Sequence, residues 1–342
     1  MKQIKLLPIL LFLWIAIFTG DSFAQITGGV CKDCHTMHYA QIWGAQEPAS
    51  RPSARLAART RQIRGLTRKD CLGCHSSSSS ETIVDNIPIV YNTGGYPSKP
   101  LAGGNFYWVA QGPAYDQMGH NVYKVSDPDT QLTQAPGNDG MVSCAGCHLS
   151  LATDPNNNTY KKNGCQGCHV EVYHHKTNRP YRFLVGCKGE SYYVKGVGDK
   201  NWEQNPTLQN HNIYQGAHDL ESTWGTHLNT THSISAFCAG CHVKFHRSSY
   251  IGSGSPWLRH PTDTLLPGAG TEYGDYDPLT AYSNQAPVAY KNPASPSRAE
   301  AVVMCLSCHR AHGSPYKDIL RWDYGSMKKG EGCLTCHTQK SP

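Results

Sequence analysis

Cysteine and histidine are the residue types whose number and spacing point to chemistry in this chain. Its 342 residues include 15 Cys and 18 His, and fourteen of the Cys fall into seven repeats of the pattern Cys-x-x-Cys-His. The thiol pairs are Cys31 and Cys34, Cys71 and Cys74, Cys144 and Cys147, Cys165 and Cys168, Cys238 and Cys241, Cys305 and Cys308, and Cys333 and Cys336. The histidines that close the seven patterns are His35, His75, His148, His169, His242, His309 and His337.

The pattern is the attachment signature of a c-type haem, in which two thiols form thioether bonds and the histidine binds the iron. Zinc ribbons, thioredoxin-like redox pairs and structural disulfides also use Cys-x-x-Cys, but none of them requires a histidine directly after it. Histidine is 18 of 342 residues, so seven coincidences are negligible. The sequence therefore predicts seven covalently attached haem c groups, each with a proximal histidine.

Eleven further histidines can supply the second axial ligand of each iron. Five methionines after the first residue could replace some of them and would raise the potential, but the surplus of histidine favours bis-His ligation. The predicted distal ligands are His38, His120, one of His174 and His175, His211, His246, His260 and His312. His218, His227 and His232 are expected to be loop residues.

Spacing along the chain supports this choice. His38, His246 and His312 follow a motif histidine by three or four residues. Three extended residues span about 10 Å, too little to pass round the ring of the same haem. Such a histidine can reach the next haem instead, and His174 or His175 follows His169 in the same way.

An internal repeat indicates the other candidates. His120 and His211 lie in similar segments, Gly-His-Asn-Val-Tyr and Asn-His-Asn-Ile-Tyr, each upstream of a Cys-Ala-Gly-Cys-His motif. The intervals from Cys71 to Cys144 and from Cys165 to Cys238 are both 73 residues. His260, ahead of Cys305, is a third version. Each is expected to ligate the haem that follows or its stacked neighbour.

Several longer stretches carry a family resemblance. They are the Cys-His-Thr-Met-His run at 34–38, residues 71–77, Gly-Gly-Asn-Phe-Tyr-Trp at 103–108, residues 235–246, Arg-His-Pro-Thr-Asp at 259–263 and residues 304–313. Together they resemble the doubled-CXXCH multihaem cytochromes of metal-reducing bacteria, over nearly the whole chain after residue 24. The resemblance implies low-potential bis-His haems and a role in extracellular electron transfer, in some members as filaments.

The N-terminus reads as an export signal. Lys2 and Lys5 precede an apolar run at 6–18, and Ser-Phe-Ala at 22–24 resembles a cleavage site. We expect residues 1–24 to be removed and the protein to be periplasmic, extracellular or on the cell surface. The remaining chain is expected to divide into residues 25–176 with haems 1–4 and residues 177–342 with haems 5–7, packed as one haem-bearing unit.

The scaffold is expected to be loop-rich. The chain holds 33 Gly and 21 Pro and only 39% hydrophobic residues, so a haem-templated multihaem cytochrome c fold with short α-helices and few short strands is predicted. Short helices are expected near 48–65 and 297–309, and brief strands at 84–91 and 192–197. Cys187, outside the motifs, is either a buried small residue, which we favour, an intermolecular disulfide or a free thiol.

Charge excludes some partners. The formal net charge of +6 is mild, and the propionates of seven haems would reverse it, so nucleic acid is not an expected partner. No stretch after the signal is apolar enough to cross a membrane. The expected partners are other redox proteins, identical subunits, or a metal oxide or soluble acceptor outside the cell.

Three functions are compatible with these motifs. The first is an electron carrier that passes electrons along closely spaced haems and needs no substrate pocket. The second is a subunit of an extracellular cytochrome filament, in which a neighbouring subunit donates one distal histidine. A multihaem reductase is the third, and it would need an open iron position.

Overall fold

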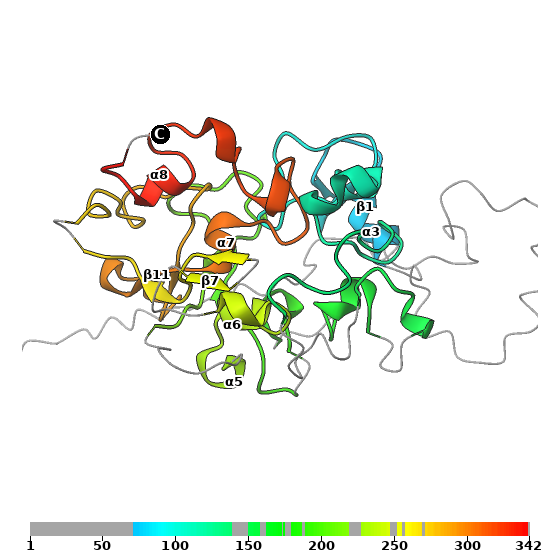
Figure 1. Cartoon of the computed structure of the whole chain (residues 1–342), viewed down its shortest axis with the longest axis horizontal. Coiled ribbons are helices and arrows are strands. Elements are labelled where there is room, and N and C mark those ends of the chain that lie inside the picture. Colours follow the sequence, from blue (N-terminus) through cyan, green and yellow to red (C-terminus); the bar gives the residue numbers. More distant parts are fainter. Residues whose placement is uncertain are drawn as a thin grey trace, which may run out of the picture.

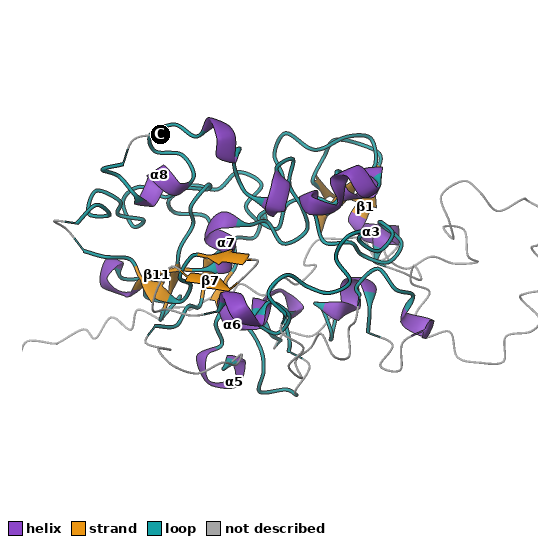
Figure 2. Cartoon of the chain, viewed as in Figure 1, coloured by secondary structure: helices purple, strands orange, loops and turns teal. Residues whose placement is uncertain are grey.

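The structure, a computed structural model, describes residues 71–138, 150–157, 162–172, 174, 179–186, 189–218, 227–246, 252–254, 257–268 and 271–340. Loops and turns connect short helices and short strands throughout these ranges (Figures 1 and 2). The predicted loop-rich fold class is therefore confirmed. Its physical reason is the composition, since 33 Gly and 21 Pro interrupt any long helix or strand.

The helices are one or two turns long. The α-helices are α3 (Leu72–His75), α5 (Leu228–Thr231), α6 (Ile234–Cys238), α7 (Cys305–Cys308) and α8 (Cys333–Cys336). The 3₁₀ helices are η1 (Val109–Gln111), η2 (Pro113–Met118), η3 (Pro155–Asn157), η4 (Gly164–Gly167), η5 (Tyr181–Phe183), η6 (Val243–Phe245), η7 (Arg298–Glu300), η8 (Lys317–Ile319) and η9 (Tyr324–Ser326).

The strands have two or three residues each. They are β1 (Ser76–Ser77), β2 (Ile83–Val84), β3 (Ile87–Pro88), β4 (Tyr91–Asn92), β5 (Gly196–Val197), β6 (Ile213–Tyr214), β7 (Gly252–Gly254), β8 (Trp257–Arg259), β9 (Thr264–Leu265), β10 (Ala289–Tyr290) and β11 (Ala301–Val303). β1 and β4 are parallel, whereas β2–β3, β5–β6 and β7–β8 are antiparallel pairs. β10, β11 and β9 form an antiparallel three-stranded sheet with β11 in the middle.

Every described Cys-x-x-Cys-His motif lies on a single helical turn. α3, α7 and α8 coincide with three motifs, α6 ends at the first thiol of a fourth, and η4 contains the first thiol of the fifth. In all five motifs the backbone N–H of the histidine donates to the carbonyl of the first cysteine, at 2.9–3.2 Å. Because residues three apart lie on one face of a turn, the two thiols point to the same side. The motif therefore builds its own local structure.

Buried apolar side chains form small separate clusters between the motifs. One cluster joins Val194, Ile234, Val302 and Met304 around α6, α7 and β11. A second surrounds Tyr290 and a third surrounds Val109. No cluster is large, which agrees with a chain whose core is completed by bound groups rather than by aliphatic side chains alone.

The helix predicted for residues 297–309 is wrong in its middle. η7 and α7 are present, but β11 lies between them and pairs with both β10 and β9. Val302 and Ala301 are fully buried in that sheet. Two consecutive β-branched residues favour the extended backbone here, and cross-strand packing outweighs the helix propensity of the flanking Ala and Arg residues.

The strand predicted at 84–91 is broken by a tight turn. Asp85 and Asn86 have φ values of 50° and 60°, so the chain reverses and β2 pairs with β3. Asp and Asn tolerate this left-handed conformation, which a two-residue hairpin requires. Only β5 forms within the strand predicted at 192–197. The helix predicted at 48–65 lies outside the described residues.

Segments far apart in the sequence meet near the centre. Gly104 pairs with Gly313 in an isolated bridge, and Gly104 has a φ of 80° and approaches that backbone too closely for a side chain. The guanidinium of Arg310 donates to the carbonyl of Leu101. These contacts cross the predicted boundary between residues 176 and 177. Along the long axis, α3 lies toward one end, α7 near the middle and α8 toward the other end (Figure 1).

Candidate haem sites

The five described motif histidines share one hydrogen-bonding arrangement. Each uses Nδ1 to bond an oxygen of the surrounding chain at 2.7–2.9 Å. The acceptors are the carbonyls of Pro88, Arg182, Pro136 and Asp318 and the carboxylate of Glu272. A metal-ligating histidine usually donates its second ring N–H in this way, which fixes the ring and its tautomer. Nε2 is thereby left for a metal.

Four of these histidines face a second histidine across a constant gap. The ring centres are 6.1 Å apart for His75 and His174, and 6.3 Å apart for His169 and His312. They are 6.0 Å apart for His242 and His120, and 6.3 Å apart for His337 and His260. Two imidazoles bound to one metal through bonds of about 2.0 Å have ring centres roughly 6 Å apart. The four gaps are therefore the size that a six-coordinate iron requires.

Two of the facing histidines also use Nδ1 to bond a backbone carbonyl. His120 donates Nδ1–H to the carbonyl of Ala311 at 2.6 Å, and His260 to its neighbour Pro261 at 2.8 Å. The His312 ring packs on Phe106 with centres 4.8 Å apart. Each of the three rings is thus oriented by a contact of its own.

Burial lowers the pKa of six of the described histidines. It lowers the pKa of His75, His120, His169 and His309, and it lowers the pKa of His242 to about 4 and that of His312 to about 3. Neighbouring imidazoles add to the effect at His242 and His312. Only a neutral imidazole has a lone pair for a metal, so the protonation state suits iron binding.

A cavity of ≈ 2690 Å³ runs through the molecule and is lined by residues of all five described motifs. Single-ligand pockets are typically about 300–1,000 Å³, so this space is suited to several large groups. His120, His174, His260 and His312 also line the cavity. So does Trp322, whose buried Nε1–H has no hydrogen-bond partner among the described residues. The donors and the space fit haem, whose carboxylates can accept such a bond.

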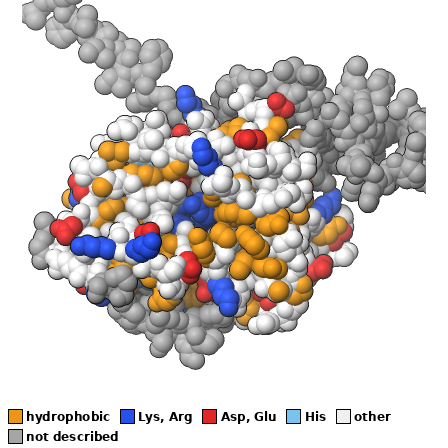
Figure 3. Space-filling view, turned by 90° about the horizontal axis from the view of Figure 1, so that it is seen from above, with side chains coloured by type: hydrophobic (Ala, Val, Ile, Leu, Met, Phe, Trp, Pro, Cys, Tyr) orange, Lys and Arg blue, Asp and Glu red, His pale blue; other side chains and the backbone are white. Residues whose placement is uncertain are grey.

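Hydrophobic side chains gather on the face seen from above, and basic side chains lie within and around this patch (Figure 3). The chemistry of this face, apolar with a few cations, suits a porphyrin with two propionates.

Thiols of different described motifs lie near one another, and two pairs of motifs are in contact. The thiol of Cys165 is within hydrogen-bonding reach of that of Cys71. Cys238 contacts Cys305 and lies within electrostatic reach of Cys168. Cys308 lies within electrostatic reach of Cys333 and Cys336 in the last motif. The described motifs therefore lie near one another in space, and two pairs of them are in direct contact.

His309 differs from the other four motif histidines. Within the described ranges no second histidine faces it at the spacing found elsewhere. Its Nδ1 bonds the carbonyl of Asp318 at 2.7 Å, as in the other motifs. One axial side of this site is therefore supplied by none of the described histidines.

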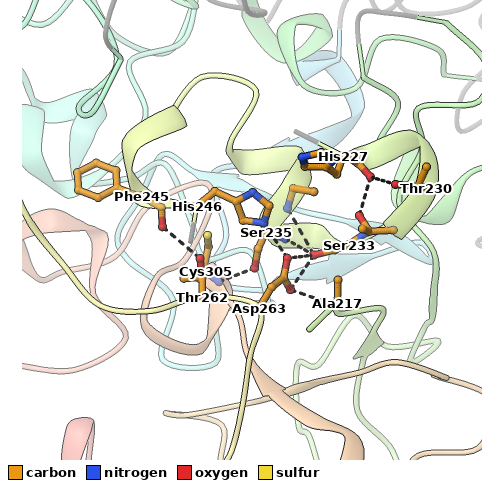
Figure 4. Close-up of polar contacts among 12 residues, drawn as sticks. Ala217, His227, Thr230, Ser233, Ser235, Phe245, His246, Thr262, Asp263 and Cys305 are labelled. Carbon is orange, nitrogen blue, oxygen red and sulfur yellow. Dashed lines mark hydrogen bonds and ion pairs between the residues drawn. The ribbon is translucent and has the colours of Figure 1, made fainter. Parts of the chain in front are cut away.

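His246 is engaged elsewhere. Its Nε2 bonds Oδ2 of the fully buried Asp263 at 2.8 Å, and the Ser233 hydroxyl donates to the same carboxylate (Figure 4). Ser233 is also the N-cap of α6, so this network fixes the helix that carries Cys238. His246 is not among the residues that line the cavity. The predicted distal role of His246 is not favoured by this arrangement.

His211 and His232 have the Nδ1 bond of a ligand but no facing histidine among the described residues. His211 bonds the carbonyl of Thr207 at 2.9 Å and stacks on Tyr282 at 4.0 Å. His232 bonds the carbonyl of Tyr193 at 2.9 Å. From sequence alone His232 is expected to be a loop residue, because no family motif surrounds it. Its bond to Tyr193 crosses 39 residues, so no local signal could have found it.

Other predicted residues lie outside the described ranges. They are Cys31, Cys34, His35, His38, Cys144, Cys147, His148, His175 and Cys187.

Two further observations concern metals and membranes. Among the described residues, no group of three or more His, Cys, Asp or Glu side chains is arranged to hold a metal ion. In the same part of the chain, no helix has the length and hydropathy needed to cross a bilayer.

Comparisons with known proteins point to the same cofactor. Residues 298–342 match the model of the doubled CXXCH motif. The chain is 26% identical to the C-type cytochrome OmcS of Geobacter sulfurreducens over 372 residues, which covers 88% of this chain and 81% of the relative.

Two solved structures are also similar to it. The outer membrane cytochrome S filament of Geobacter sulfurreducens aligns with a TM-score of 0.44 at 21% identity, covering 90% of this chain and 86% of that one. The OmcS nanowires of the same organism align with a TM-score of 0.41 at 20% identity, covering 92% of both chains. In its repeated Cys-x-x-Cys-His turns, its facing histidines and its matched motif, the chain is similar to multihaem c-type cytochromes.

Proposed function

We propose that the chain binds one haem c at each of its seven motifs and conducts electrons along them. The observation that carries the proposal is the set of four histidine pairs with ring centres 6.0–6.3 Å apart. Bis-His ligation fills both axial positions of an iron, so these sites suit electron transfer rather than substrate binding. The protein is then an electron-transfer protein without chemistry of its own.

The proposed ligand pairs are those that face each other. They are His75 with His174, His169 with His312, His242 with His120, and His337 with His260. His38, His175 and His211 stay proposed distal ligands for haems whose motifs or partners lie outside the described ranges. His246 is left out of the proposed set because its Nε2 is bonded to Asp263.

The haem supplies one-electron exchange between ferric and ferrous iron, and the chain controls where this happens. The thiols hold each ring to one helical turn, and the Nδ1 bonds fix the imidazoles so that little rearrangement accompanies a change of charge. His312 faces His169 although it follows His309, so this one short segment would hold two neighbouring haems. Linked ligation of this kind keeps neighbouring haems at a fixed distance.

Haem stoichiometry tests this proposal. The mass of the intact protein should equal the chain from Gln25 plus seven haems, and a pyridine haemochrome assay should give the same number. A mass with five or fewer haems, or with zinc, would contradict it. Stopped-flow oxidation of the fully reduced protein by a soluble ferric chelate should draw on all the haems. Oxidation of only one or two, at sufficient driving force, would rule out a continuous path.

The site at His309 favours a second candidate, a filament of identical subunits. If a neighbouring subunit donates the missing histidine, the ligand is absent in the isolated subunit and present in the polymer. The oxidised subunit should then show one high-spin haem in its EPR spectrum, which disappears on assembly as filaments form in negative-stain micrographs. His38→Ala and His175→Ala variants would show whether either residue is the donor.

Two other outcomes are distinguishable. A monomer without any high-spin signal would show that His309 has a partner within its own chain, as in a discrete carrier. A high-spin signal that persists in every assembly state and shifts on adding a small ligand would favour the reductase. Under either transport function we expect the protein to work outside the inner membrane, with a redox protein, an identical subunit or an external acceptor as partner.

A further inference from the structure

Two buried arginines flank the motif at α7. Arg310 follows His309 directly, and Arg321 lies on the segment paired with it. The backbone N–H of Arg321 donates to the carbonyl of Cys308 at 2.8 Å, and that of Arg310 to the carbonyl of Ile319 at 2.9 Å. Their side chains are only 7% and 5% exposed. The backbones of both arginines are therefore attached to the segments on either side of the haem-binding turn.

The Arg310 side chain is held by uncharged oxygens. It donates to the carbonyls of Leu101 and Ala102 at 3.0 and 3.2 Å and to Oδ1 of Asn284 at 3.1 Å. Burial and the charge of Arg321 lower the pKa of Arg310 to about 10, which leaves it protonated at neutral pH.

The Arg321 side chain bonds the haem-binding turn itself. Its Nε donates to the carbonyl of Leu306, inside α7, at 2.7 Å, and one of its terminal nitrogens donates to the carbonyl of Asn284 at 2.9 Å. Within the described ranges, no carboxylate forms an ion pair with either arginine. The two cations are thus satisfied as hydrogen-bond donors but not neutralised by contact.

Three carboxylates also act near this motif. Glu203 is 3% exposed and acts on Arg310 from a distance, with its Oε1 accepting bonds from the Asn212 backbone N–H and the Tyr282 hydroxyl. At the other end of α7, Cys305 faces both Asp263 and His246, which are bonded to each other. The exposed Asp318 acts on His309. The charge at this motif is therefore mixed, and the two arginines supply its fixed positive part.

Burying two cations side by side costs desolvation energy, which hydrogen bonds and nearby negative charge must offset. Reduction of a haem iron removes one unit of positive charge, so nearby cations favour the reduced form. In a low-dielectric interior this influence is much stronger than in water. Because the donors of both arginines already bond the chain, the charge acts through its field rather than by direct contact.

We propose that Arg310 and Arg321 raise the reduction potential of the haem held by Cys305, Cys308 and His309 above the value it would have without these two charges. The proposal rests on haem binding at this motif, as proposed above. The step is a one-electron reduction of ferric to ferrous iron by an external reductant, and no proton is required.

Potentiometric titration followed by visible and EPR spectra tests the proposal in the full-length, haem-loaded protein. A Cys305→Ala/Cys308→Ala variant, which lacks this haem, identifies its component by the one that disappears. Arg310→Gln and Arg321→Gln should each lower the midpoint of that component, changing its ratio of reduced to oxidised haem about tenfold at a fixed potential, or 59 mV. The Arg310→Lys and Arg321→Lys variants keep the charge and should change this midpoint potential far less.

Two further variants keep the test decisive if a Gln substitution prevents folding. Glu203→Gln removes the buried carboxylate that acts on Arg310, with little change of shape. It should raise the midpoint potential of the same component. Arg298→Gln is the matched control, since Arg298 also donates to three backbone carbonyls but lies beside the last motif. It should leave the component of the α7 haem in place.

The outcomes separate this inference from the proposed function. Absence of the α7 haem from the wild-type mass would overturn the proposed function itself. A fully loaded protein whose α7 component is unmoved by Arg→Gln and by Glu203→Gln would overturn only the inference. An equal shift of all components would do the same, because the charge would then act on the whole molecule and not on one haem.

Discussion

His312 and His246 occupy equivalent places in the sequence but have different surroundings. Each follows a motif histidine, His312 by three residues and His246 by four. The His312 ring faces His169 across 6.3 Å at the cavity, whereas Nε2 of His246 is bonded to Asp263 at 2.8 Å. The same spacing therefore leads to an iron-sized gap in one region and to a buried polar network in the other.

The difference arises from the residues that each histidine's segment contacts. After His309 the chain is held by Gly103, whose carbonyl accepts the backbone N–H of His312, and the ring is directed into the cavity. Residues 243–245 form η6, which brings His246 beside a carboxylate from the segment before β9. A buried carboxylate needs donors, and a histidine within reach provides one. Spacing from the motif thus permits ligation without deciding it.

Replacing His312 should have the largest effect. His312→Ala removes one proposed axial ligand, so one haem should change from low-spin to high-spin while the others keep their spectra. His246→Ala is the matched control and should produce no high-spin haem. EPR of the oxidised proteins measures both. High-spin signals of equal size in the two variants would show that His246 is also a ligand.

Removing the carboxylate should weaken the folded state strongly. Asp263→Ala leaves the Ser233 hydroxyl, the Ala217 backbone N–H and His246 without an acceptor in a buried region. We expect a loss of about 3 kcal/mol in the free energy of unfolding. Urea unfolding followed by Soret absorbance measures it. Asp275→Ala, at an exposed position, should change stability by less than about 0.5 kcal/mol, and equal losses would contradict the role of the network.

Substituting the cap of α6 should have an intermediate effect. The Ser233 hydroxyl accepts from the backbone N–H groups of Ser235 and Ala236, so Ser233→Ala should cost about 1 kcal/mol. Ser233→Thr keeps the hydroxyl and should restore most of this stability in the same urea titration. If Thr is no better than Ala, the side chain contributes by packing and not by capping.

The smallest effect is expected at Phe106. Its ring packs on His312 with centres 4.8 Å apart, so Phe106→Leu should remove about 0.5 kcal/mol of ring contact and loosen the imidazole. The haem should stay low-spin, with altered EPR anisotropy of one component. Phe106→Tyr retains the ring and should leave that component unchanged. A high-spin signal in Phe106→Leu would show that orientation of His312 depends on this contact alone.

Much of the local structure was predictable because it is encoded in short segments. A Cys-x-x-Cys-His run closes its own turn through one backbone bond from His to Cys, whatever surrounds it. Loop-rich character follows equally from composition. Predictions that depended on longer segments were less successful. Residues 301–303 are extended because two neighbouring strands pair with them. No pattern within residues 301–303 predicts which strands these are.

The sequence by itself determined the cofactor chemistry, since thiol and imidazole spacing within five residues decides what can be attached and bonds within one turn present it. Which histidines meet was decided only by the tertiary structure. His120 and His242 are 122 positions apart and face each other at 6.0 Å, whereas His211, in the same repeated segment as His120, stacks on Tyr282. Local bonds fix a turn, but a pair of axial ligands must come from two segments. Their approach depends on the packing of everything between them.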